Sequence, residues 1–446
     1  MSELFAGLQA AGGVRDAVSD LAWVQAMLDA EAALAGALAD AGRIGRVEAD
    51  SIAAACDASL YDVTELGQAA VSVGNPVVPL VRELTRQAGD AGASVHSGAT
   101  SQDILDTAAM LVARRAMDVL LADLAGCADA VARLAADHVD TVQAGRTLLQ
   151  QAAPTTFGLT AAVWLSGLVA AEVALRQARG QLAVQLGGAV GTLAALGDDG
   201  PAVLTSMARR LDLAEPVLPW HTERSRIAAL AAALGQTAGT VATIGRTVTV
   251  LAQTEIGELT EEGPQNSGGS STMPHKRNPV AAVLACSCAQ QAPGLVATLL
   301  ATMGHEHQRA AGSWHAEWRP LTELLRSTGS AVAWLRTSLQ RLRVHPERMR
   351  RNVEAAGGLL TTERVATVLT GAVGRLAAHD AVAACSRRAV DGDGDLLDLL
   401  AADPVIGGQL DRAQLRHLLD PGQYLGSAEE FVHRTLHDYD NRRGRQ

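Results

Sequence analysis

Two long stretches without proline limit what this chain of 446 residues can fold into. Residues 103–139 and 224–262 both carry apolar residues at helical spacing, and neither contains a proline. Each is longer than the roughly 10 to 14 residues of an average globular helix. Further helical runs follow Thr156, Pro279 and Pro320, and no segment alternates apolar and polar residues between hairpin turns. The sequence therefore predicts an all-α fold.

The small side chains of these runs predict that the helices bury more than one face. Alanine and glycine are abundant in them, and small residues let helix axes approach closely. We expect an N-terminal helical domain over 1–103, a central bundle of long helices over 104–345 with a mobile loop at 263–279, and a small helical domain over 346–446. The excess of small apolar surface beyond the needs of one bundle predicts an obligate oligomer.

The charge balance excludes several classes of partner. A net charge of −11 argues against non-specific binding to nucleic acid or to an anionic membrane, because both need a basic face. The first residues include the acidic Glu3 and do not resemble a signal peptide, and the five cysteines have no disulfide-framework spacing. The apolar run 227–252 is interrupted by Arg246, so we interpret it as a buried helix and not as a membrane span. We expect a cytoplasmic protein.

A loop rich in glycine and serine, EEGPQNSGGSSTMPHKRNP at 261–279, separates two helical runs. It contains Lys276, the only lysine among 37 basic residues. Lysine is a compact charge whose pKa burial can tune, whereas arginine is a planar and permanently charged fork. Ser270 and Ser271 add hydroxyl groups, and Asn278 adds an amide. Such loops often act as lids over active sites, although a flexible linker is the plainer alternative.

A second polar stretch, VHSGATSQD at 95–103, precedes the first long helical run. Hydroxyl groups and free backbone N–H groups at a helix N-terminus bind anions such as a carboxylate or a phosphate. The alternative is a simple N-cap supplied by Ser101 or Asp103, and both interpretations can hold together. This stretch contributes four candidate binding residues, namely His96, Thr100, Ser101 and Gln102.

A third stretch, HEHQRAAGSWHAEW at 305–318, combines histidine, arginine and tryptophan. Its histidines have neither the HExxH spacing nor a clear third ligand, so we expect no metal site. Trp314 and Trp318 are four residues apart, which favours packing on one helix face. Arg309 has a fork-shaped side chain suited to holding a carboxylate, and a surface ion pair is the alternative.

Three stretches together resemble the signature regions of the fumarase/aspartase superfamily. They are SGATSQD, GRTLLQQAAPTTFG and GSSTMPHKRNP, in the order and at about the spacing of those regions. The resemblance implies an all-α homotetramer in which each subunit contributes five long helices to a twenty-helix core. It also implies active sites that are each assembled from three subunits, a small tricarboxylate substrate, and no cofactor.

The same resemblance assigns roles to individual residues. Ser270 matches the serine that transfers a proton at the carbon next to a carboxylate, and Lys276 and Asn278 match the groups that stabilise the aci-carboxylate intermediate. Arg309 matches an arginine that holds a substrate carboxylate. The remaining residues predicted to contact the substrate are His96, Thr100, Ser101, Gln102, Thr147, Gln151, Ser271 and Met273.

One position departs from the pattern of most lyases in the superfamily. They usually carry histidine in the second region, where it helps to protonate a poor leaving group, whereas this chain has Leu148. A carboxylate leaves, or attacks, already ionised, so Leu148 favours the carboxymuconate cycloisomerases, which the stretches at 219–226 and 305–318 also resemble. The alternatives are an adenylosuccinate lyase-type C–N lyase and, from another class, a catalytically inactive helical scaffold.

Overall fold

The computed structural model describes residues 7–264, 269, 273 and 276–444, and it divides into two compact units. Unit 1 joins Met1–Ala125, Ala170–Thr243 and Val283–Arg336, and unit 2 joins Gly126–Val169, Ile244–Ala282 and Thr337–Gln446. Each unit is therefore built from three separate segments of the chain.

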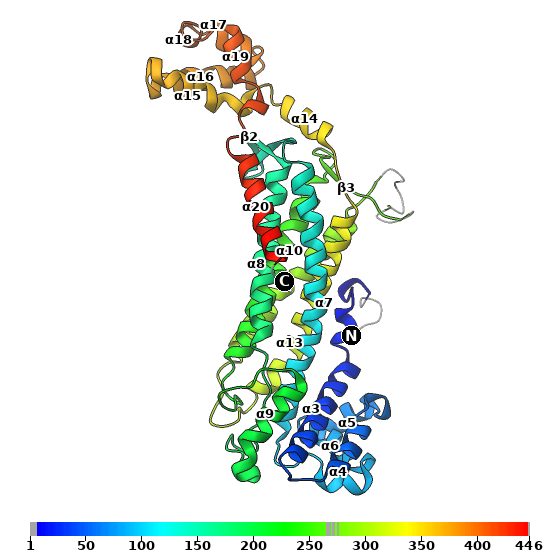
Figure 1. Cartoon of the computed structure of the whole chain (residues 1–446). Coiled ribbons are helices and arrows are strands. Elements are labelled where there is room, and N and C mark those ends of the chain that lie inside the picture. The colour runs from blue at the N-terminus through cyan, green and yellow to red at the C-terminus, as the bar shows by residue number, and fades with distance from the viewer. Residues whose placement is uncertain (1–6, 265–268, 270–272, 274–275, 445–446) are drawn as a thin grey trace. The chain divides into compact units, whose positions relative to one another are not determined.

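Helices dominate both units, which confirms the predicted all-α class (Figure 1). The helices up to the polar loop are α2 (Val14–Ala17), α3 (Asp20–Asp40), α4 (Arg46–Ala55), α5 (Val63–Val73), α6 (Val77–Gln87), α7 (Ser101–Asp137), α8 (Phe157–Gly180), α9 (Gly200–Leu211) and α10 (Ser225–Leu251). After it come α11 (Val280–Ala289), α12 (Ala292–Ala301), α13 (Ser313–Gln340), α14 (Pro346–Glu354), α15 (Thr362–Val373), α16 (Arg375–Val390), α17 (Leu396–Ala402), α18 (Pro404–Gly407), α19 (Arg412–Leu418) and α20 (Ala428–Arg443). The strands are β1 (Val142–Thr147), β2 (Gln150–Thr156), β3 (Leu259–Glu261) and β4 (Leu342–Val344).

The two proline-free runs form the helices α7 and α10, as the sequence predicts. Helix α10 ends at Leu251, earlier than the run itself, because the chain turns at Gly257 with a φ of +61° and then enters strand β3. Helix α13 begins at Ser313, so Pro320 lies inside the helix and not before it. The chain tolerates this proline in a helix that is buried along much of its length.

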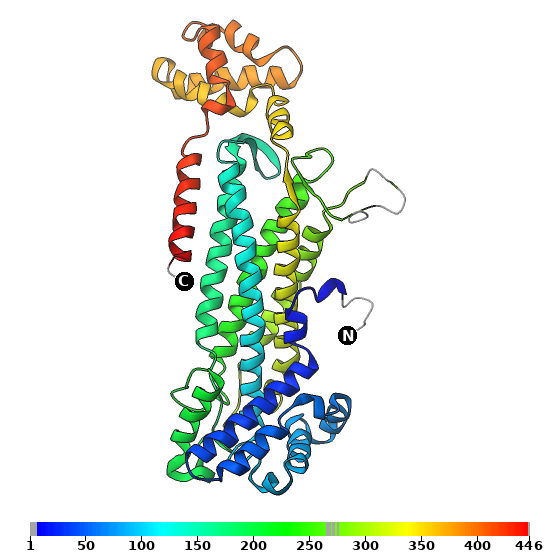
Figure 2. The ribbon, with the colours of Figure 1, turned by 45° about the vertical axis from the view of Figure 1, so that its right-hand side comes forward.

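In unit 1, helix α3 packs against α4 and α9 (Figure 2). The buried face of α3 carries large apolar residues such as Leu28, Leu34 and Leu38. Gly36 lies on the same helix, and a Cβ atom placed there would lie 2.6 Å from Nη1 of Arg210 in α9. The absence of a side chain at Gly36 therefore leaves room for the Arg210 guanidinium against α3.

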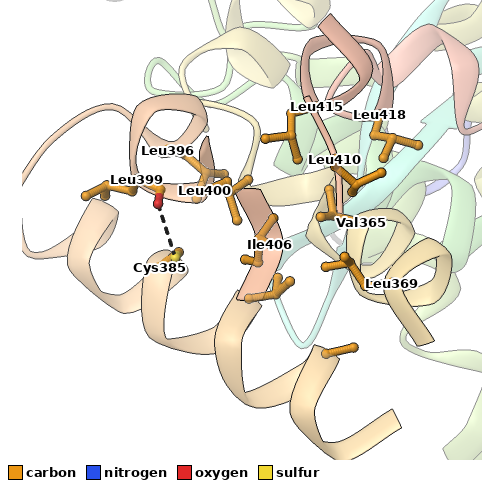
Figure 3. Close-up of a cluster of buried hydrophobic side chains, with 12 residues drawn as sticks. Val365, Leu369, Cys385, Leu396, Leu399, Leu400, Ile406, Leu410, Leu415 and Leu418 are labelled. Carbon is orange, nitrogen blue, oxygen red and sulfur yellow. Dashed lines mark hydrogen bonds between the residues drawn. The ribbon is translucent and has the colours of Figure 1, made fainter. Parts of the chain in front are cut away.

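Unit 2 contains two small antiparallel sheets and a separate apolar core. In one sheet β1 pairs with β2, and in the other β3 pairs with β4. The sequence shows no alternation typical of hairpin strands, but residues 142–156 form the β1–β2 hairpin. Helices α15 to α19 enclose buried leucine, valine and isoleucine side chains, and the thiol of Cys385 donates to the carbonyl oxygen of Leu399 at 3.6 Å (Figure 3).

Within the described part of the chain, four helical stretches are long and apolar enough to cross a membrane by length and composition alone, which does not establish insertion. They are Asp20–Asp40, Phe157–Gly180, Ser225–Leu251 and Val280–Ala301. The share of each apolar window that is buried within the chain ranges from 33% to 67%. Each helix therefore combines a face packed inside the protein with apolar surface that the described residues do not cover.

Two glycines of α8 offer a matched test of close packing. A Cβ atom on Gly158 would lie 2.6 Å from the carbonyl oxygen of His138, whereas one on Gly180 would meet nothing within 4 Å. Because backbone cannot yield as a flexible side chain can, Gly158→Ala should lower the free energy of unfolding by about 1 to 3 kcal/mol. Gly180→Ala should leave it unchanged or raise it by up to about 1 kcal/mol. Thermal and denaturant unfolding of both variants would check this, and equal effects would contradict it.

Candidate active site

The start of α7 is held by the buried carboxylate of Asp103. Its two oxygens accept hydrogen bonds from the backbone N–H groups of Thr100, Gly187 and Gly188 at 2.9 to 3.0 Å. Oδ1 of Asp103 also lies 2.7 Å from Nε2 of His221. Helix α7 begins at Ser101, so Asp103 is its third residue and not its N-cap. Asp103 accepts from the backbone N–H of Thr100, the residue before the helix, as the third residue of a capping box does, and it ties two distant segments of unit 1 to the helix.

Gln102, the next residue toward the N-terminus, is fully buried and connects the helix to Arg309. Its amide nitrogen donates to Asp106 at 3.1 Å and to the carbonyl oxygen of His221 at 2.8 Å. Its amide oxygen accepts from Nη1 of Arg309 at 3.1 Å, and Nη2 of Arg309 donates to the carbonyl oxygen of Ala189 at 3.0 Å. The structure thus brings together two residues that are 207 positions apart in the sequence.

About one helical turn after Gln102, Asp106 forms a buried ionic cluster with Arg224 and Glu317. The Arg224 guanidinium donates to both oxygens of Asp106 at 2.9 and 3.1 Å and to both oxygens of Glu317 at 3.1 and 2.6 Å. Burial opposes the charge of Arg224, but the two carboxylates outweigh it and raise its pKa above the usual value. The indole nitrogen of Trp314 donates to Asp106 at 3.0 Å. Bidentate pairs of this kind fix the orientation of both partners.

The histidines of the third stretch have neighbours within unit 1. His305 lies 3.2 Å from Glu317 through Nε2, and its Nδ1 is buried without a hydrogen-bond partner among the described residues. His315 lies against the rings of Trp314 and Trp318, whose own centroids are 4.9 Å apart. The prediction that the two tryptophans pack together is confirmed, and Trp314 in addition donates a hydrogen bond to the ionic cluster.

His96 occupies a strained position in the turn that precedes α7. Its φ is +58°, a region that favours glycine, and its Nδ1 lies 2.6 Å from Oε1 of Glu31 in α3. Thr100 and Ser101 follow at the first turn of the helix and are half-buried. Unit 1 therefore holds His96, Thr100, Ser101, Gln102 and Arg309 of the predicted site residues.

Unit 2 holds the second signature region at the tip of the β1–β2 hairpin. Thr147 pairs with Gln150, so Leu148 and Leu149 form a two-residue turn with φ values of +50° and +66°. Positive φ at both central residues is typical of a type I′ turn, which normally contains asparagine and glycine. The two leucines are 97% and 78% exposed. Thr147 and Gln151 are also exposed at this tip.

The base of the hairpin is fixed by the buried carboxylate of Glu258. It accepts hydrogen bonds from Arg146 at 2.6 and 3.1 Å, from Gln143 at 2.8 Å and from Asn352 at 2.7 Å. Burial opposes the charge of Glu258, but these hydrogen bonds outweigh it and hold its pKa below the usual value. The exposed tip therefore projects from a rigid base.

The described part of the polar loop also belongs to unit 2. Gly269 and Arg277 form an antiparallel bridge, and the backbone N–H of Lys276 donates to the carbonyl oxygen of Met273 at 3.1 Å. Lys276 is exposed, Asn278 is half-buried and Met273 is 44% exposed. Ser270 and Ser271, to which we assign the proton transfer and a substrate contact, lie outside the described residues.

The sequence motifs do not identify four acidic or basic residues of unit 1 that surround the candidate site residues. They are Glu31, Asp106, Arg224 and Glu317, and all are buried. The sequence offers little signal for them, because Glu31 follows Asp29 by two residues and Asp106 follows Asp103 by three in apolar helical runs. A charge in such a place is seldom buried unless it is paired.

Comparisons with known proteins identify relatives along almost the whole chain. The family model described as "Lyase" matches residues 9–294, and that of the adenylosuccinate lyase C-terminus matches residues 358–435. The 3-carboxy-cis,cis-muconate cycloisomerase of Pseudomonas aeruginosa is 44% identical over 98% of this chain and 96% of that protein. The nitrosuccinate lyase of Streptomyces davaonensis is 42% identical over 98% of this chain and 94% of that protein.

A solved structure has the same fold. The crystal structure of the 3-carboxy-cis,cis-muconate lactonizing enzyme from Pseudomonas putida matches with a TM-score of 0.92 and 39% identity. The match covers 99% of each chain. The predicted resemblance to the fumarase/aspartase superfamily is confirmed by these relatives.

The ionic cluster predicts that replacing two different arginines of unit 1 will lower the free energy of unfolding by very different amounts. Arg224→Met leaves two buried carboxylates without their partner, so it should lower the free energy of unfolding by roughly 3 to 5 kcal/mol. Arg179 pairs with Asp118 at 2.6 Å on the surface, and Arg179→Met should change it by about 1 kcal/mol or less. Denaturant unfolding of the two variants measures the difference. Similar losses in both would contradict the prediction that the buried cluster contributes more to stability than the surface pair.

Proposed function

The chain belongs to the lyase family of the fumarase/aspartase superfamily, and on that premise we propose that it converts 3-carboxy-cis,cis-muconate to 4-carboxymuconolactone. This reaction is a ring closure in the protocatechuate branch of the β-ketoadipate pathway. It is an intramolecular addition, so the product has the same atoms as the substrate. No cofactor is needed.

The observation that carries this proposal is the hairpin tip at Leu148. Most lyases of the superfamily have a histidine at this position to protonate the leaving group, and Leu148 cannot transfer a proton. A carboxylate that attacks a double bond is already ionised and has no proton to lose. The full-length similarity to cycloisomerases from two Pseudomonas species supports the same conclusion.

The chemistry follows from the charges of the substrate. One terminal carboxylate forms a C–O bond with the carbon that bears the 3-carboxyl group, and the electron pair of the double bond moves onto the other terminal carboxylate. Lys276 and Asn278 stabilise the resulting aci-carboxylate. Ser270 then delivers a proton to the adjacent carbon, which completes the lactone. Electrostatic stabilisation of this kind is usually the largest catalytic contribution.

Unit 1 has the groups to hold the carboxylates of the substrate. Arg309 is oriented by Gln102 and by the carbonyl oxygen of Ala189, which leaves the rest of its guanidinium for a carboxylate. Thr100 and Ser101 stand at the N-terminus of a helix of 37 residues, where backbone N–H groups and the helix dipole favour an anion. In a chain of net charge −11, these groups make a locally favourable environment for a tricarboxylate.

We also propose that four chains assemble and that three of them contribute to each active site. Leu148 and Leu149 are exposed apolar residues in a strained turn, which is costly unless a neighbouring chain covers them. The uncovered apolar faces of α8, α10 and α11–α12 support the same conclusion. Burial of these faces between subunits accounts for them in a cytoplasmic protein, without a membrane.

A second activity is favoured by one of the relatives. Nitrosuccinate lyase, 42% identical, is named for a substrate whose nitro group can leave as the nitrite anion. Such a leaving group needs no protonation, so Leu148 is compatible with it as well. An adenylosuccinate-type reaction is less suitable, because its amine must be protonated as it leaves. A turnover assay with all three substrates separates these activities from one another and from an inactive scaffold.

The first experiment tests the reaction and Ser270 together. The purified protein should convert 3-carboxy-cis,cis-muconate at a higher kcat/KM than nitrosuccinate or adenylosuccinate. Ser270→Ala should reduce kcat by roughly 10² to 10⁴, because it removes the acid–base group. Ser51→Ala, at an exposed serine of α4, is the control and should keep full activity. Faster turnover of nitrosuccinate would overturn the proposed substrate, and an active Ser270→Ala variant would overturn the role of Ser270.

The second experiment tests whether active sites are shared. Arg309→Ala and Lys276→Arg should each be nearly inactive, the latter because a planar guanidinium replaces a compact ammonium. Co-expressed in one oligomer, they should recover activity in about one quarter of the sites if Arg309 and Lys276 come from different chains. Co-expression of Lys276→Arg with Asn278→Ala should recover nothing, because both changes lie on one loop. Equal recovery in the two mixtures, or none in either, would contradict the shared site.

A further inference from the structure

Glu31 and His96 form a carboxylate–histidine pair that motif-based assignments of the site do not include. Oε1 of Glu31 lies 2.6 Å from Nδ1 of His96, although the residues are 65 positions apart. The side chain of Glu31 is 0% exposed and that of His96 is 19% exposed. The pair therefore has one end inside the protein and one end near the surface where α7 begins.

The surroundings of Glu31 show why its charge needs this partner. Helix α3 buries Glu31 among small side chains, with Ala30 and Ala33 as buried neighbours in the chain. Its second oxygen, Oε2, is buried without a hydrogen-bond partner among the residues that the structure describes. An isolated buried carboxylate is strongly destabilising, so a cationic partner is the main source of compensation.

The geometry of His96 directs its other ring nitrogen away from Glu31. The hydrogen bond to the carboxylate uses Nδ1, which leaves Nε2 as the donor for a ligand. The backbone of His96 has a φ of +58°, in the left-handed region that favours glycine. Such a conformation persists where the surroundings hold a side chain in one place, and here the contact with Glu31 does so.

We propose that Glu31 is a positioning residue that keeps His96 as an imidazolium, whose Nε2–H donates to a carboxylate of the substrate. This inference rests on the proposed function for the identity of the anion, but not for the pairing itself. The imidazolium of His96 would be a second positive group for the substrate at the start of α7, in addition to Arg309. The pairing also explains why a helix in the apolar part of unit 1 contains a buried acid.

The charged groups around His96 agree with this assignment. Burial disfavours the imidazolium, but the hydrogen bond and charge of Glu31 from α3 and the charge of Asp103 from α7 outweigh it, so the pKa of His96 is raised above its ordinary value. Asp103 is itself paired with His221, and Glu48 of α4 accepts from Ser94 at 3.0 Å. Among the residues that the structure describes, Glu31 is therefore the one carboxylate that forms an ion pair with His96.

The sign of the pH dependence follows from the raised pKa. The imidazolium is fully present below the ordinary pKa of histidine, and it is lost as the pH rises through the raised value. Substrate affinity should therefore fall on the alkaline side. Replacing Glu31 by glutamine removes the charge while keeping the shape, so the same loss should occur at lower pH.

The decisive experiment compares Glu31→Gln with the matched control Asp29→Asn. Asp29 lies on the same helix and pairs with Arg115, so its loss removes a charge from α3 without touching His96. Deuterium exchange at the imidazole C2 carbon, read by mass spectrometry on peptide 87–114, reports the pKa of His96, the only histidine in that peptide. Glu31→Gln should lower this pKa by about 1 or more, and Asp29→Asn should leave it unchanged.

Kinetics add a readout that a purely structural role would not move. For Glu31→Gln, KM for 3-carboxy-cis,cis-muconate should rise about tenfold at pH 8 and stay within about threefold of wild type at pH 6, because the imidazolium persists only in acid. A uniform loss at both pH values, or an unchanged pKa of His96, overturns the proposal.

A second variant covers the case in which Glu31→Gln does not fold. The double variant Glu31→Gln/His96→Gln has a neutral pair that can still form a hydrogen bond, so its KM should not increase as the pH rises. If its KM increases with pH as much as that of the wild type, the proposal is overturned. The exchange measurement needs no substrate, so a protein that fails to lactonise carboxymuconate but has a raised, Glu31-dependent pKa at His96 counts against the proposed function and not against the pair.

Discussion

The buried carboxylate of Asp103 is the interaction on which the first half of the candidate site depends. It accepts from three backbone N–H groups, at Thr100, Gly187 and Gly188, and it pairs with His221. These contacts place the start of α7 against two loops that are distant in the sequence. Because these contacts hold Asp103, they also fix the direction of the N-terminus of α7. The turn before the helix and the side chain of Gln102 are held with it, and Gln102 in turn orients Arg309 through a hydrogen bond.

Much of the fold could be predicted from the sequence because it depends on local patterns. The apolar spacing and absence of proline over 103–139 predict α7, and the glycine and serine residues of 261–279 predict an irregular loop. The three signature stretches predict the superfamily, because their residue types and order are specific. The division into three domains at 103 and 345 stays a prediction, as do the roles of the site residues.

The rest could not be predicted because it depends on contacts between distant residues. Arg224 and Asp106 are 118 positions apart, and neither their spacing nor their neighbours indicate that they pair. The β1–β2 hairpin lacks the alternation and the Asn-Gly turn by which short strands are usually found, since its tip is Leu148-Leu149. Pro320 would normally end a helix, but the packing of α13 in unit 1 holds the helix together around it. In each case tertiary contacts outweigh the local preference.

The single lysine has a practical consequence for handling the protein. Amine-reactive cross-linkers, fluorophores and coupling resins usually distribute over many surface lysines and leave an enzyme active. In this chain the only ε-amine is that of Lys276, in the loop to which we assign stabilisation of the aci-carboxylate, and the α-amine is the one other target. Attachment to a surface is therefore better directed to engineered cysteines, with the five native thiols replaced or blocked, or to the carboxylates.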